Sequence, residues 1–293
     1  MQKFIEKAQT LLEALPYIQQ FRHKTIVIKY GGAAMLQEEL KHSFALDVIL
    51  MQLVGIRPVI VHGGGPQISR LLKKLGKESC FVHGLRVTDS ETMEAVEMVL
   101  GGRINKEIVG LIQQHGGRAV GISGRDGRLL LATKMENLMD GGQEIDLGLV
   151  GEVKKVNPEI LKILEEKGFI PVVAPIGEGP QGEIYNINAD DVAGEIAAAL
   201  QADKLVLLTD VPGILARNDT LLSTLAVQEA KELIDHRVIT SGMIPKVRSC
   251  LRALEGGLNK AHILDGRIEH VLLLEIFTQK GVGTQIVSSH QSM

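Results

Sequence analysis

Two lysines of this sequence stand where a phosphoryl group could be handled. Lys29 lies near the end of the apolar run Thr25–Tyr30, directly ahead of two glycines whose amides can touch the same phosphate as its ammonium. Lys246 belongs to a second glycine-containing helix start, residues 241–246. Because a transferring phosphoryl group spreads negative charge over its oxygens, two lysines can supply most of the catalysis without a strong base. Lys29 by itself fits an ordinary surface lysine at a strand end equally well.

A second apolar run, residues 58–62, leads into Gly63, Gly64 and Gly65, followed by Pro66. Glycines at such a turn leave backbone N–H groups accessible at a helix start, where anions bind, and a plain tight turn would need only one of them. In open α/β sheets ligands lie beyond the carboxyl ends of the strands. The two turns therefore predict one site for a phosphorylated or carboxylated molecule. Neither the P-loop pattern nor the dinucleotide pattern is present, so a nucleotide must be held in another way.

Two more polar segments are candidates for ligand contacts. Arg86, between apolar neighbours, suits a two-pronged bond to a substrate carboxylate, and it suits a salt bridge with an acidic side chain equally well. Residues 186–191 hold Asn186, Asn188, Asp190 and Asp191 at a helix start. Capping accounts for one of these four residues, and the excess suggests contacts to a substrate or to the lysines.

Strands and helices are predicted to alternate along the chain, which indicates a largely parallel sheet covered by helices on both faces. The segment from Ser90 to His115 is predicted as one long helix, started by a capping box of Thr88 and Glu91. No linker rich in proline or serine occurs, so two lobes that share one sheet are expected, with a seam near residues 185–190. The other predicted strands are 25–30, 58–62, 118–122, 129–132, 151–156, 170–174, 204–209, 261–264 and 283–287, and the other helices 37–54, 66–75, 158–167, 189–200, 227–234, 244–254 and 269–277.

Ahead of the first strand, apolar residues recur at helical spacing. They predict an amphipathic helix that precedes the rest of the fold. Two interpretations stay open, a helix packed on its own domain and a helix packed on another subunit. The residues concerned are Phe4, Ala8, Leu11, Leu12, Leu15 and Ile18.

Composition excludes several classes of function. The 293 residues carry a net charge of −3, which argues against a general nucleic-acid binder, and the low aromatic content of 3% argues against a base-stacking surface. Cys80 and Cys250 lack metal or disulfide spacing, so no metal site is predicted and a cytoplasmic location with reduced thiols is expected. No signal peptide or apolar stretch of about 18 residues is found, so no membrane partner is expected.

The motifs together resemble the amino-acid kinase family, and within it the kinases that act on N-acetylglutamate. The resemblance spans nearly the whole chain. Single motifs are shared with aspartokinase and glutamate 5-kinase, whereas the segments 84–88 and 186–190 look specific. Ser241 departs from the pattern, since a glycine often stands there. The matching segments are Lys29-Tyr30-Gly31-Gly32, His62-Gly63-Gly64-Gly65-Pro66, Gly84-Leu85-Arg86-Val87-Thr88, Asn186-Ile187-Asn188-Ala189-Asp190 and Gly242-Met243-Ile244-Pro245-Lys246.

The resemblance implies a three-layer αβα sandwich with a mainly parallel sheet. It further implies an N-terminal oligomerisation helix at 1–22, an acceptor-substrate lobe at 23–187 and a nucleotide-binding lobe at 188–293. The implied reaction transfers the γ-phosphoryl group of Mg-ATP to the γ-carboxylate of N-acetyl-L-glutamate, a step of arginine biosynthesis. The acceptor is already an anion, so no general base is required.

By motif position, Lys29 and Lys246 would stabilise the transferring phosphoryl group and Asp190 would hold both lysines. The resemblance also assigns residues to three binding sites. These are Gly64, Gly65, Arg86 and Asn186 for the substrate, Gly31, Gly32, Thr209, Asp210 and Gly213 for the nucleotide, and Tyr17, Lys204, His262, Glu275 and Gly281 for L-arginine as inhibitor.

Members with such an N-terminal helix resemble arginine-inhibited homohexamers, built as trimers of dimers. Two rival hypotheses remain. One is a sister kinase that acts on free glutamate or aspartate. The other is a catalytically silent anion sensor, for example for arginine, against which the presence of Lys29, Lys246 and Asp190 argues.

Overall fold

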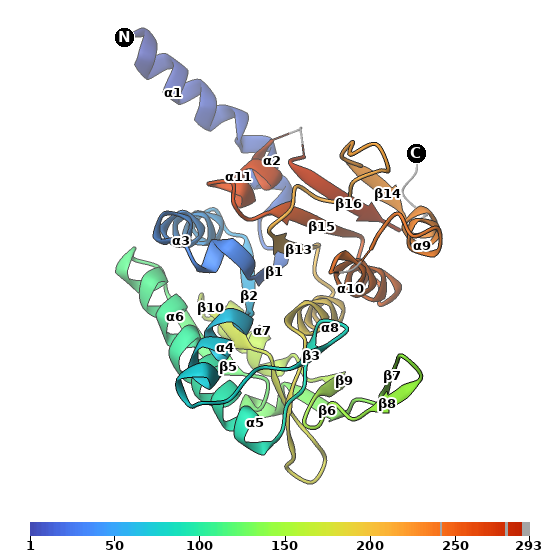
Figure 1. Cartoon of the computed structure of the whole chain (residues 1–293). Helices are drawn as coiled ribbons and strands as arrows, with labels where there is room; N and C mark the ends of the chain where they lie inside the picture. Colours follow the sequence, from blue (N-terminus) through green and yellow to red (C-terminus); the bar gives the residue numbers. More distant parts are fainter. Residues whose placement is uncertain (241, 279–280, 289–293) are drawn as a thin grey trace.

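The computed structural model describes residues 1–240, 242–278 and 281–288, and Ser241 lies outside these ranges. Eight strands form the central sheet in the order β14-β16-β15-β13-β1-β2-β10-β5. All neighbouring strands run parallel except β15 and β16, and helices cover both faces (Figure 1). The predicted fold class is confirmed. The strands are β1 Thr25–Tyr30, β2 Arg57–His62, β5 Ala119–Ser123, β10 Ile170–Ala174, β13 Lys204–Thr209, β14 Thr224–Ala226, β15 Lys260–Asp265 and β16 Gly283–Val287.

Side chains of the central strands divide between two hydrophobic cores, one on each face of the sheet. Along β1, Ile26 and Ile28 belong to one core and Val27 to the other, because successive side chains of a strand point to opposite faces. A strand that is buried on both faces has a continuous run of apolar residues. This run is why β1 could be located from the sequence. The helices are α1 Gln2–Glu13, α2 Leu15–Phe21, α3 Glu38–Leu53, α4 Gly65–Lys74, α5 Ser90–Val96, α6 Asn105–Gln114, α7 Glu159–Glu166, α8 Ala189–Leu200, α9 Val227–Asp235, α10 Met243–Glu255 and α11 Val271–Phe277.

Smaller strands extend the half of the molecule that holds β5. They form one four-stranded sheet, in the order β12-β11-β6-β9, and two hairpins, β3-β4 and β7-β8. The hairpin β3-β4 ends at Arg86, so this small element positions one of the predicted site residues. The strands are β3 Phe81–Val82, β4 Leu85–Arg86, β6 Leu130–Lys134, β7 Leu138–Asp140, β8 Gln143–Ile145, β9 Gly151–Val156, β11 Ile176–Glu178 and β12 Ile184–Asn186.

The long helix predicted from Ser90 to His115 is interrupted. A π-helical segment, η2 Glu97–Ile104, separates α5 from α6. The predicted capping box is wrong, because Thr88 is fully buried and its hydroxyl donates to the carbonyl of Arg86. Asp89 caps α5 instead, accepting a hydrogen bond from the backbone N–H of Thr92 at 2.8 Å. Short 3₁₀ turns, η1 Gly32–Met35 and η3 Asp126–Arg128, follow β1 and β5.

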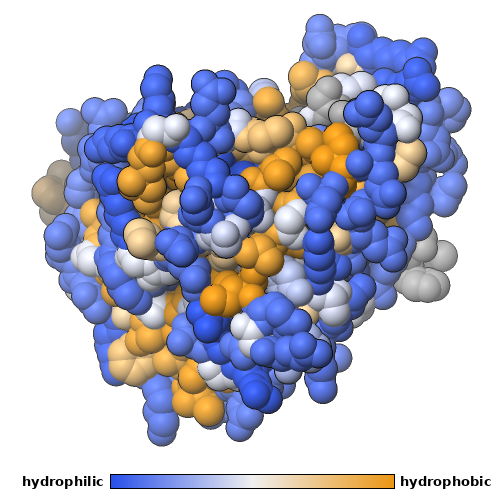
Figure 2. Space-filling model, turned by 60° about the horizontal axis from the view of Figure 1, so that its bottom comes forward, coloured by the Kyte–Doolittle hydropathy of each residue, from blue (hydrophilic) through white to orange (hydrophobic). Residues whose placement is uncertain are grey.

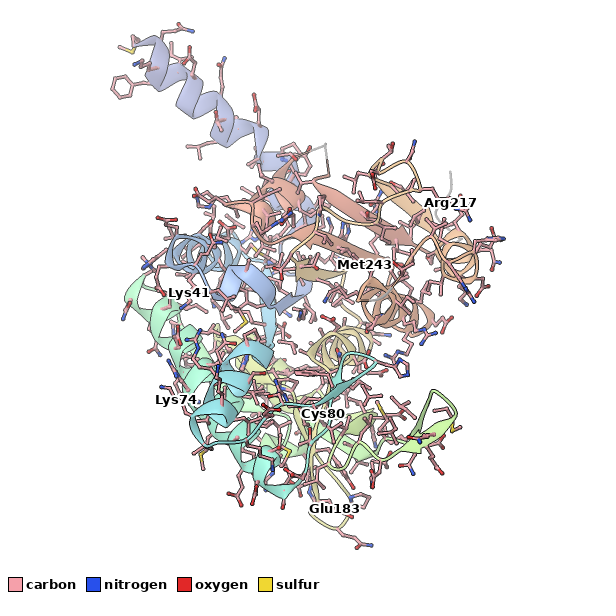
Figure 3. All side chains as sticks on the ribbon, in the orientation of Figure 1. Lys41, Lys74, Cys80, Glu183, Arg217 and Met243 are labelled. Atoms are coloured by element: carbon pink, nitrogen blue, oxygen red, sulfur yellow. The ribbon has the colours of Figure 1, made fainter. Side chains whose placement is uncertain are left out.

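The N-terminal segment forms two helices rather than one, with Pro16 in the first turn of α2. Helix α1 projects away from the body of the protein, and its side chains point outward around it (Figures 1 and 3). Phe4, Leu11 and Leu12 are 71%, 75% and 66% exposed, whereas Phe21 of α2 is buried in the core. Only α2 therefore packs on the chain's own domain.

On the face shown in Figure 2, hydrophobic side chains lie in separate patches between hydrophilic ones. Among the described residues, none of the helices combines the length and the apolar character needed to cross a membrane.

Candidate active site

Lys29, Asp190 and Lys246 meet where β1, α8 and α10 converge. Asp190 lies in the first turn of α8, with one carboxylate oxygen 3.0 Å from the Nζ atom of Lys29 and the other 2.8 Å from that of Lys246. Lys29 and Asp190 are 8% and 5% exposed. One carboxylate therefore contacts two ammonium groups, and the role of the two lysines in stabilising a transferring phosphoryl group stays a prediction.

The electrostatics of this cluster follow from its burial. Burial alone would raise the pKa of Asp190, but the two ammonium groups outweigh it and bring this pKa to about 2. Burial also lowers the pKa of Lys29, and the neighbouring charge of Lys246 adds to that effect, while Asp190 opposes it. Asp190 is consequently a carboxylate at neutral pH, and its charge keeps two lysines together in a partly dehydrated place.

The two glycine turns lie side by side at this cluster. The backbone N–H of Gly63 donates to the carbonyl of Tyr30 at 2.9 Å, which ties the second turn to the end of β1. Gly32 has a φ of +66°, a conformation that favours glycine, and a Cβ there would collide with the Asp210 carboxylate. A cavity of 230 Å³ opens between the turns. Its lining includes Lys29, Gly31, Gly32, Gly63, Gly64, Gly65, Asn188 and Asp190.

A second cavity, of 160 Å³, contains Arg86 and shares the glycine turn with the first. Arg86 is 6% exposed and donates to the hydroxyls of Ser79 and Ser69 at 2.6 and 2.8 Å and to the carbonyl of Gly65 at 2.8 Å. Burial lowers its pKa. None of the ion pairs between described residues involves Arg86, so the salt-bridge alternative finds no support there.

Asn186 also lines this second cavity, and its amide donates to the hydroxyl of Thr88 at 3.2 Å. Gly64, Gly65, Asn188 and Ala189 line both cavities. A ligand carboxylate at Arg86 and a reacting group at the lysines would thus be joined across one glycine turn.

The predicted nucleotide residues divide into two groups. Gly31 and Gly32 line the lysine cavity, whereas Thr209 and Gly213 line neither of the two cavities. Gly213 has a φ of +142°, and a Cβ there would collide with Leu221 and with Thr284, whose hydroxyl accepts from the backbone N–H of Ile214. Asp210 accepts a hydrogen bond from the backbone N–H of Ala33 at 2.5 Å and so holds the first turn of η1. The assignment of these residues to a nucleotide stays a prediction.

Sequence reasoning missed two residues at the site and gave a third, Asn188, no role of its own among the polar residues of 186–191. Asn188 caps α8 by accepting from the backbone N–H groups of Asp190 and Asp191, and this cap orients the turn that carries Asp190. Ser69 and Ser79 supply the hydroxyls that hold Arg86. The excess of polar residues in 186–191 was the sequence signal for Asn188. Ser69 and Ser79 lie in ordinary polar segments, which give no signal that these serines hold an arginine.

A third cavity, of 730 Å³, brings together all five residues predicted for arginine, namely Tyr17, Lys204, His262, Glu275 and Gly281. The Glu275 carboxylate lies 2.8 Å from Nδ1 of His262 and 3.3 Å from Nζ of Lys204. Burial would raise the pKa of Glu275, but these two neighbours lower it overall. Burial lowers the pKa values of His262 and Lys204. The lining of the cavity therefore includes the Glu275 carboxylate beside two basic side chains, His262 and Lys204.

Comparison with known proteins extends these observations. Residues 24–265 match the model of the family described as "Amino acid kinase family". The chain belongs to the amino acid kinase family. It is 60% identical over 291 residues to a protein named acetylglutamate kinase from Geotalea uraniireducens, which covers 98% of this chain and 100% of that protein. This member of the family is a kinase, an enzyme that transfers a phosphoryl group from ATP.

Solved structures of N-acetylglutamate synthase from Neisseria gonorrhoeae are also similar. One, complexed with coenzyme A and N-acetylglutamate, has a TM-score of 0.84 and 30% identity. Another, complexed with coenzyme A and L-arginine, has a TM-score of 0.80 and 28% identity. The matches cover 96% of this amino acid kinase in both cases, but only 63% and 65% of the synthase chains.

Proposed function

We propose that this kinase phosphorylates the γ-carboxylate of N-acetyl-L-glutamate and serves arginine biosynthesis. The observation that carries the proposal is the shared glycine turn, with the Lys29–Asp190–Lys246 cluster on one side and Arg86, held by neutral partners, on the other. A dicarboxylate fits this arrangement, because Arg86 can hold its α-carboxylate while the γ-carboxylate reaches the lysines. The 60% identity to a protein named acetylglutamate kinase supports the acetylated substrate.

In the proposed reaction, an oxygen of the γ-carboxylate attacks the γ-phosphorus of ATP. A new O–P bond forms, the bond to the β–γ bridging oxygen breaks, and ADP leaves with that electron pair. Lys29 and Lys246 stabilise the negative charge on the phosphoryl oxygens, while backbone N–H groups of the glycine turns contact the same oxygens. The acceptor is a carboxylate, so no proton has to be removed. The product is an acyl phosphate.

Mg²⁺ enters this scheme with ATP, as part of the substrate. Asp190 is already occupied by two lysines, so the triphosphate and water supply most of the ligands of the ion. The proposal keeps 23–187 as the lobe for the acceptor and 188–293 as the lobe for the nucleotide, with Thr209, Asp210 and Gly213 along the nucleotide.

The decisive experiment measures ADP release with N-acetylglutamate, free glutamate and aspartate in turn. We expect turnover with the acetylated acid, and a fall of about 10²-fold or more in kcat for Lys246→Ala with a smaller change in KM, since the lysine acts mostly in the transition state. Faster turnover with a free amino acid would favour the sister kinases. Nucleotide binding without ADP release under any of these conditions would favour the sensor.

We further propose that L-arginine inhibits the enzyme by binding in the 730 Å³ cavity. The Glu275 carboxylate suits a guanidinium group, and the Lys204 ammonium suits an α-carboxylate. The synthase structure with L-arginine comes from a protein 28% identical to this chain, which lends support to the same ligand class.

Glu275→Gln tests the arginine proposal, because it removes the negative charge and keeps the size of the side chain. We expect the arginine concentration for half inhibition to rise at least about tenfold, as a charged hydrogen bond contributes about 1.5–3 kcal/mol. Activity without arginine should stay within about twofold. Equal sensitivity of the variant and the parent would place the arginine site elsewhere.

The same proposal includes a homohexamer built from dimers, through the exposed apolar side chains of α1, and a cytoplasmic location. Large apolar side chains exposed along one helix are typical of a contact surface for another chain. Both cysteines are free, which is compatible with a reducing compartment.

A further inference from the structure

His62, directly ahead of the glycine turn, is completely buried and lines none of the three cavities. Its Nδ1 atom lies 3.0 Å from the carbonyl oxygen of Gly63, and its Nε2 atom lies 3.3 Å from the amide nitrogen of Asn105. A carbonyl only accepts, so Nδ1 carries the proton and Nε2 accepts from Asn105. Burial lowers the pKa of His62 to about 4, so the ring is neutral near pH 7 and matches both contacts.

Asn105 is equally buried and is fixed on its other sides. Its amide nitrogen also lies 2.9 Å from the carbonyl oxygen of Val172 on β10 and 3.3 Å from that of Ile122 on β5, and its oxygen accepts from Nζ of Lys106 at 3.0 Å. Gly121 on β5 makes room for it, because a Cβ there would collide with the Asn105 oxygen. Asn105 is thus anchored to two neighbouring strands, β10 and β5, before it contacts His62.

The π-helical segment η2 contacts the same turn. A Cβ on Gly64 would come within 2.5 Å of side-chain carbons of Leu100 and Ile104. Asn105 follows directly after Ile104. The end of η2 therefore packs against Gly64 and also places Asn105 beside His62. Insertions that turn an α-helix into a π-helix often occur at functional sites.

We propose that His62 and Asn105 are positioning residues that set the direction of the peptide between Gly63 and Gly64. In a trans peptide the carbonyl and the next N–H point in opposite directions, and no peptide bond between described residues is cis. With the Gly63 carbonyl held towards the buried His62 ring, the N–H of Gly64 points away from it, towards the cavity that Gly64 lines. This N–H donates to no other described residue, so it is available to an oxygen of the ligand. The inference rests on the proposed phosphoryl transfer.

Two substitutions of His62 separate its two nitrogens. The amide nitrogen of His62→Asn takes about the place of Nδ1 and can still donate to Gly63, whereas that of His62→Gln takes about the place of Nε2 and leaves the Gly63 carbonyl without its donor. We expect kcat to fall about tenfold or more in His62→Gln and to stay within about threefold in His62→Asn, because misdirecting one preorganised N–H donor costs transition-state stabilisation. KM for ATP should not change.

Amide hydrogen exchange of residues 57–68 in the free protein supplies a second readout that needs no activity. We expect this segment to exchange about tenfold faster in His62→Gln than in His62→Asn. Asn105→Ala, combined with His62→Gln, should lower kcat no further than His62→Gln alone, since Asn105 acts only by fixing the His62 ring that holds the Gly63 carbonyl. Should His62→Gln fail to fold, Asn105→Ala takes its place in both comparisons with His62→Asn, because it removes the donor that fixes Nε2 of His62.

Ile112→Ala is the matched control, because Ile112 is fully buried on α6 and lines no part of the site. It should lower stability and leave kcat per folded enzyme unchanged. Equal kcat and exchange for the two His62 variants, or a loss in Ile112→Ala as large as in His62→Gln, overturns the inference. If the parent enzyme fails to phosphorylate N-acetylglutamate, the proposed function is wrong, while the exchange comparison still decides the role of His62.

Discussion

At the scale of single residues, Asp190 has the largest consequence, because one buried carboxylate compensates two lysines. Lys29 and Lys246 would repel each other without it, and the desolvated ammonium of Lys29 would lose its counter-ion. In our proposal the positive charge that the reaction needs is that of the two lysines. Asp190 keeps both of them in the folded protein without touching the phosphoryl group itself. Removing one partner of a buried ion pair is strongly destabilising, whereas exposed pairs contribute little.

Asp190→Asn should therefore reduce both stability and turnover. We expect the free energy of unfolding to fall by about 3 kcal/mol in urea denaturation, and kcat to fall at least about 10²-fold, because the lysines lose their alignment. Asp146→Asn removes an exposed carboxylate paired with Lys134 and serves as the control, with a much smaller change in stability than Asp190→Asn. Similar changes in the two variants would disprove the role of Asp190.

Asp47 provides a pH-dependent test at the same scale. It is 1% exposed and accepts from Nδ1 of His270 at 2.6 Å and from the backbone N–H of Leu272, at the start of α11. Burial raises its pKa to about 6, although these hydrogen bonds oppose the effect. The unfolded chain loses this proton near pH 4 and the folded protein only near pH 6, so stability at this site decreases as pH rises through that interval.

Asp47→Asn should remove this dependence. We expect the unfolding free energy of the parent to decrease relative to that of the variant by up to about 1.4 kcal/mol per pH unit between about pH 4 and 6, and the difference to be constant above pH 7. Denaturation curves of both proteins at five pH values measure it. Parallel curves across the whole range would show that Asp47 ionises alike in the folded and unfolded chain.

At the scale of elements, helix starts place most of the site. The first turns of α8 and α10 carry Asp190 and Lys246, and α4 begins in the second glycine turn. Helix starts suit this purpose because their free N–H groups and their dipole favour anions. The π segment η2 has a feature that a regular helix lacks. Its wider turns change the direction in which the following side chains, beginning with Asn105, leave the helix.

Asn188→Ala tests the link between the cap of α8 and the site. Loss of an N-cap costs about 1 kcal/mol of stability, and kcat should fall about tenfold, because Asp190 lies in the turn that the cap orders. Asn188→Asp keeps an accepting oxygen and should restore stability, measured by thermal denaturation beside ADP release. A stable but equally inactive Asn188→Asp would point to a ligand contact of the amide instead.

At the scale of the whole molecule, the exposed helix α1 and the cavity beside α2 are neighbours in sequence but separate in structure. Tyr17, Gln20 and Phe21 of α2 line the 730 Å³ cavity, whereas none of the α1 side chains that the structure describes does. Assembly and arginine binding can therefore be tested apart.

Deleting residues 1–13 should reduce the proposed hexamer to dimers and keep arginine binding, whereas deleting residues 1–22 should abolish both. Light scattering after gel filtration gives the mass, and calorimetric titration with arginine gives the affinity. A hexamer that survives the shorter deletion would exclude α1 from assembly, and unchanged arginine binding in the longer deletion would exclude α2 from the arginine site.

The sequence by itself determined the local features of this protein. Continuous apolar runs such as Thr25–Tyr30 located the central strands, and the glycines after them located the turns that line the site, because both signals lie within a few neighbouring residues. Their motifs and a family resemblance predicted that Lys29, Asp190 and Lys246 act together. In the structure the Nζ atoms of both lysines lie within 3.0 Å of the Asp190 carboxylate oxygens.

Only the tertiary structure decided which distant residues contact one another. The Thr88 cap was wrong because its hydroxyl is buried against Arg86, and the partners of Arg86 are serines rather than an acid. The contact of His62 with Asn105 joins residues 43 positions apart. The π segment η2, which directly precedes Asn105, was not predicted from any local sequence pattern. Such contacts depend on how strands and helices pack, and packing is a property of the whole chain rather than of any segment of it.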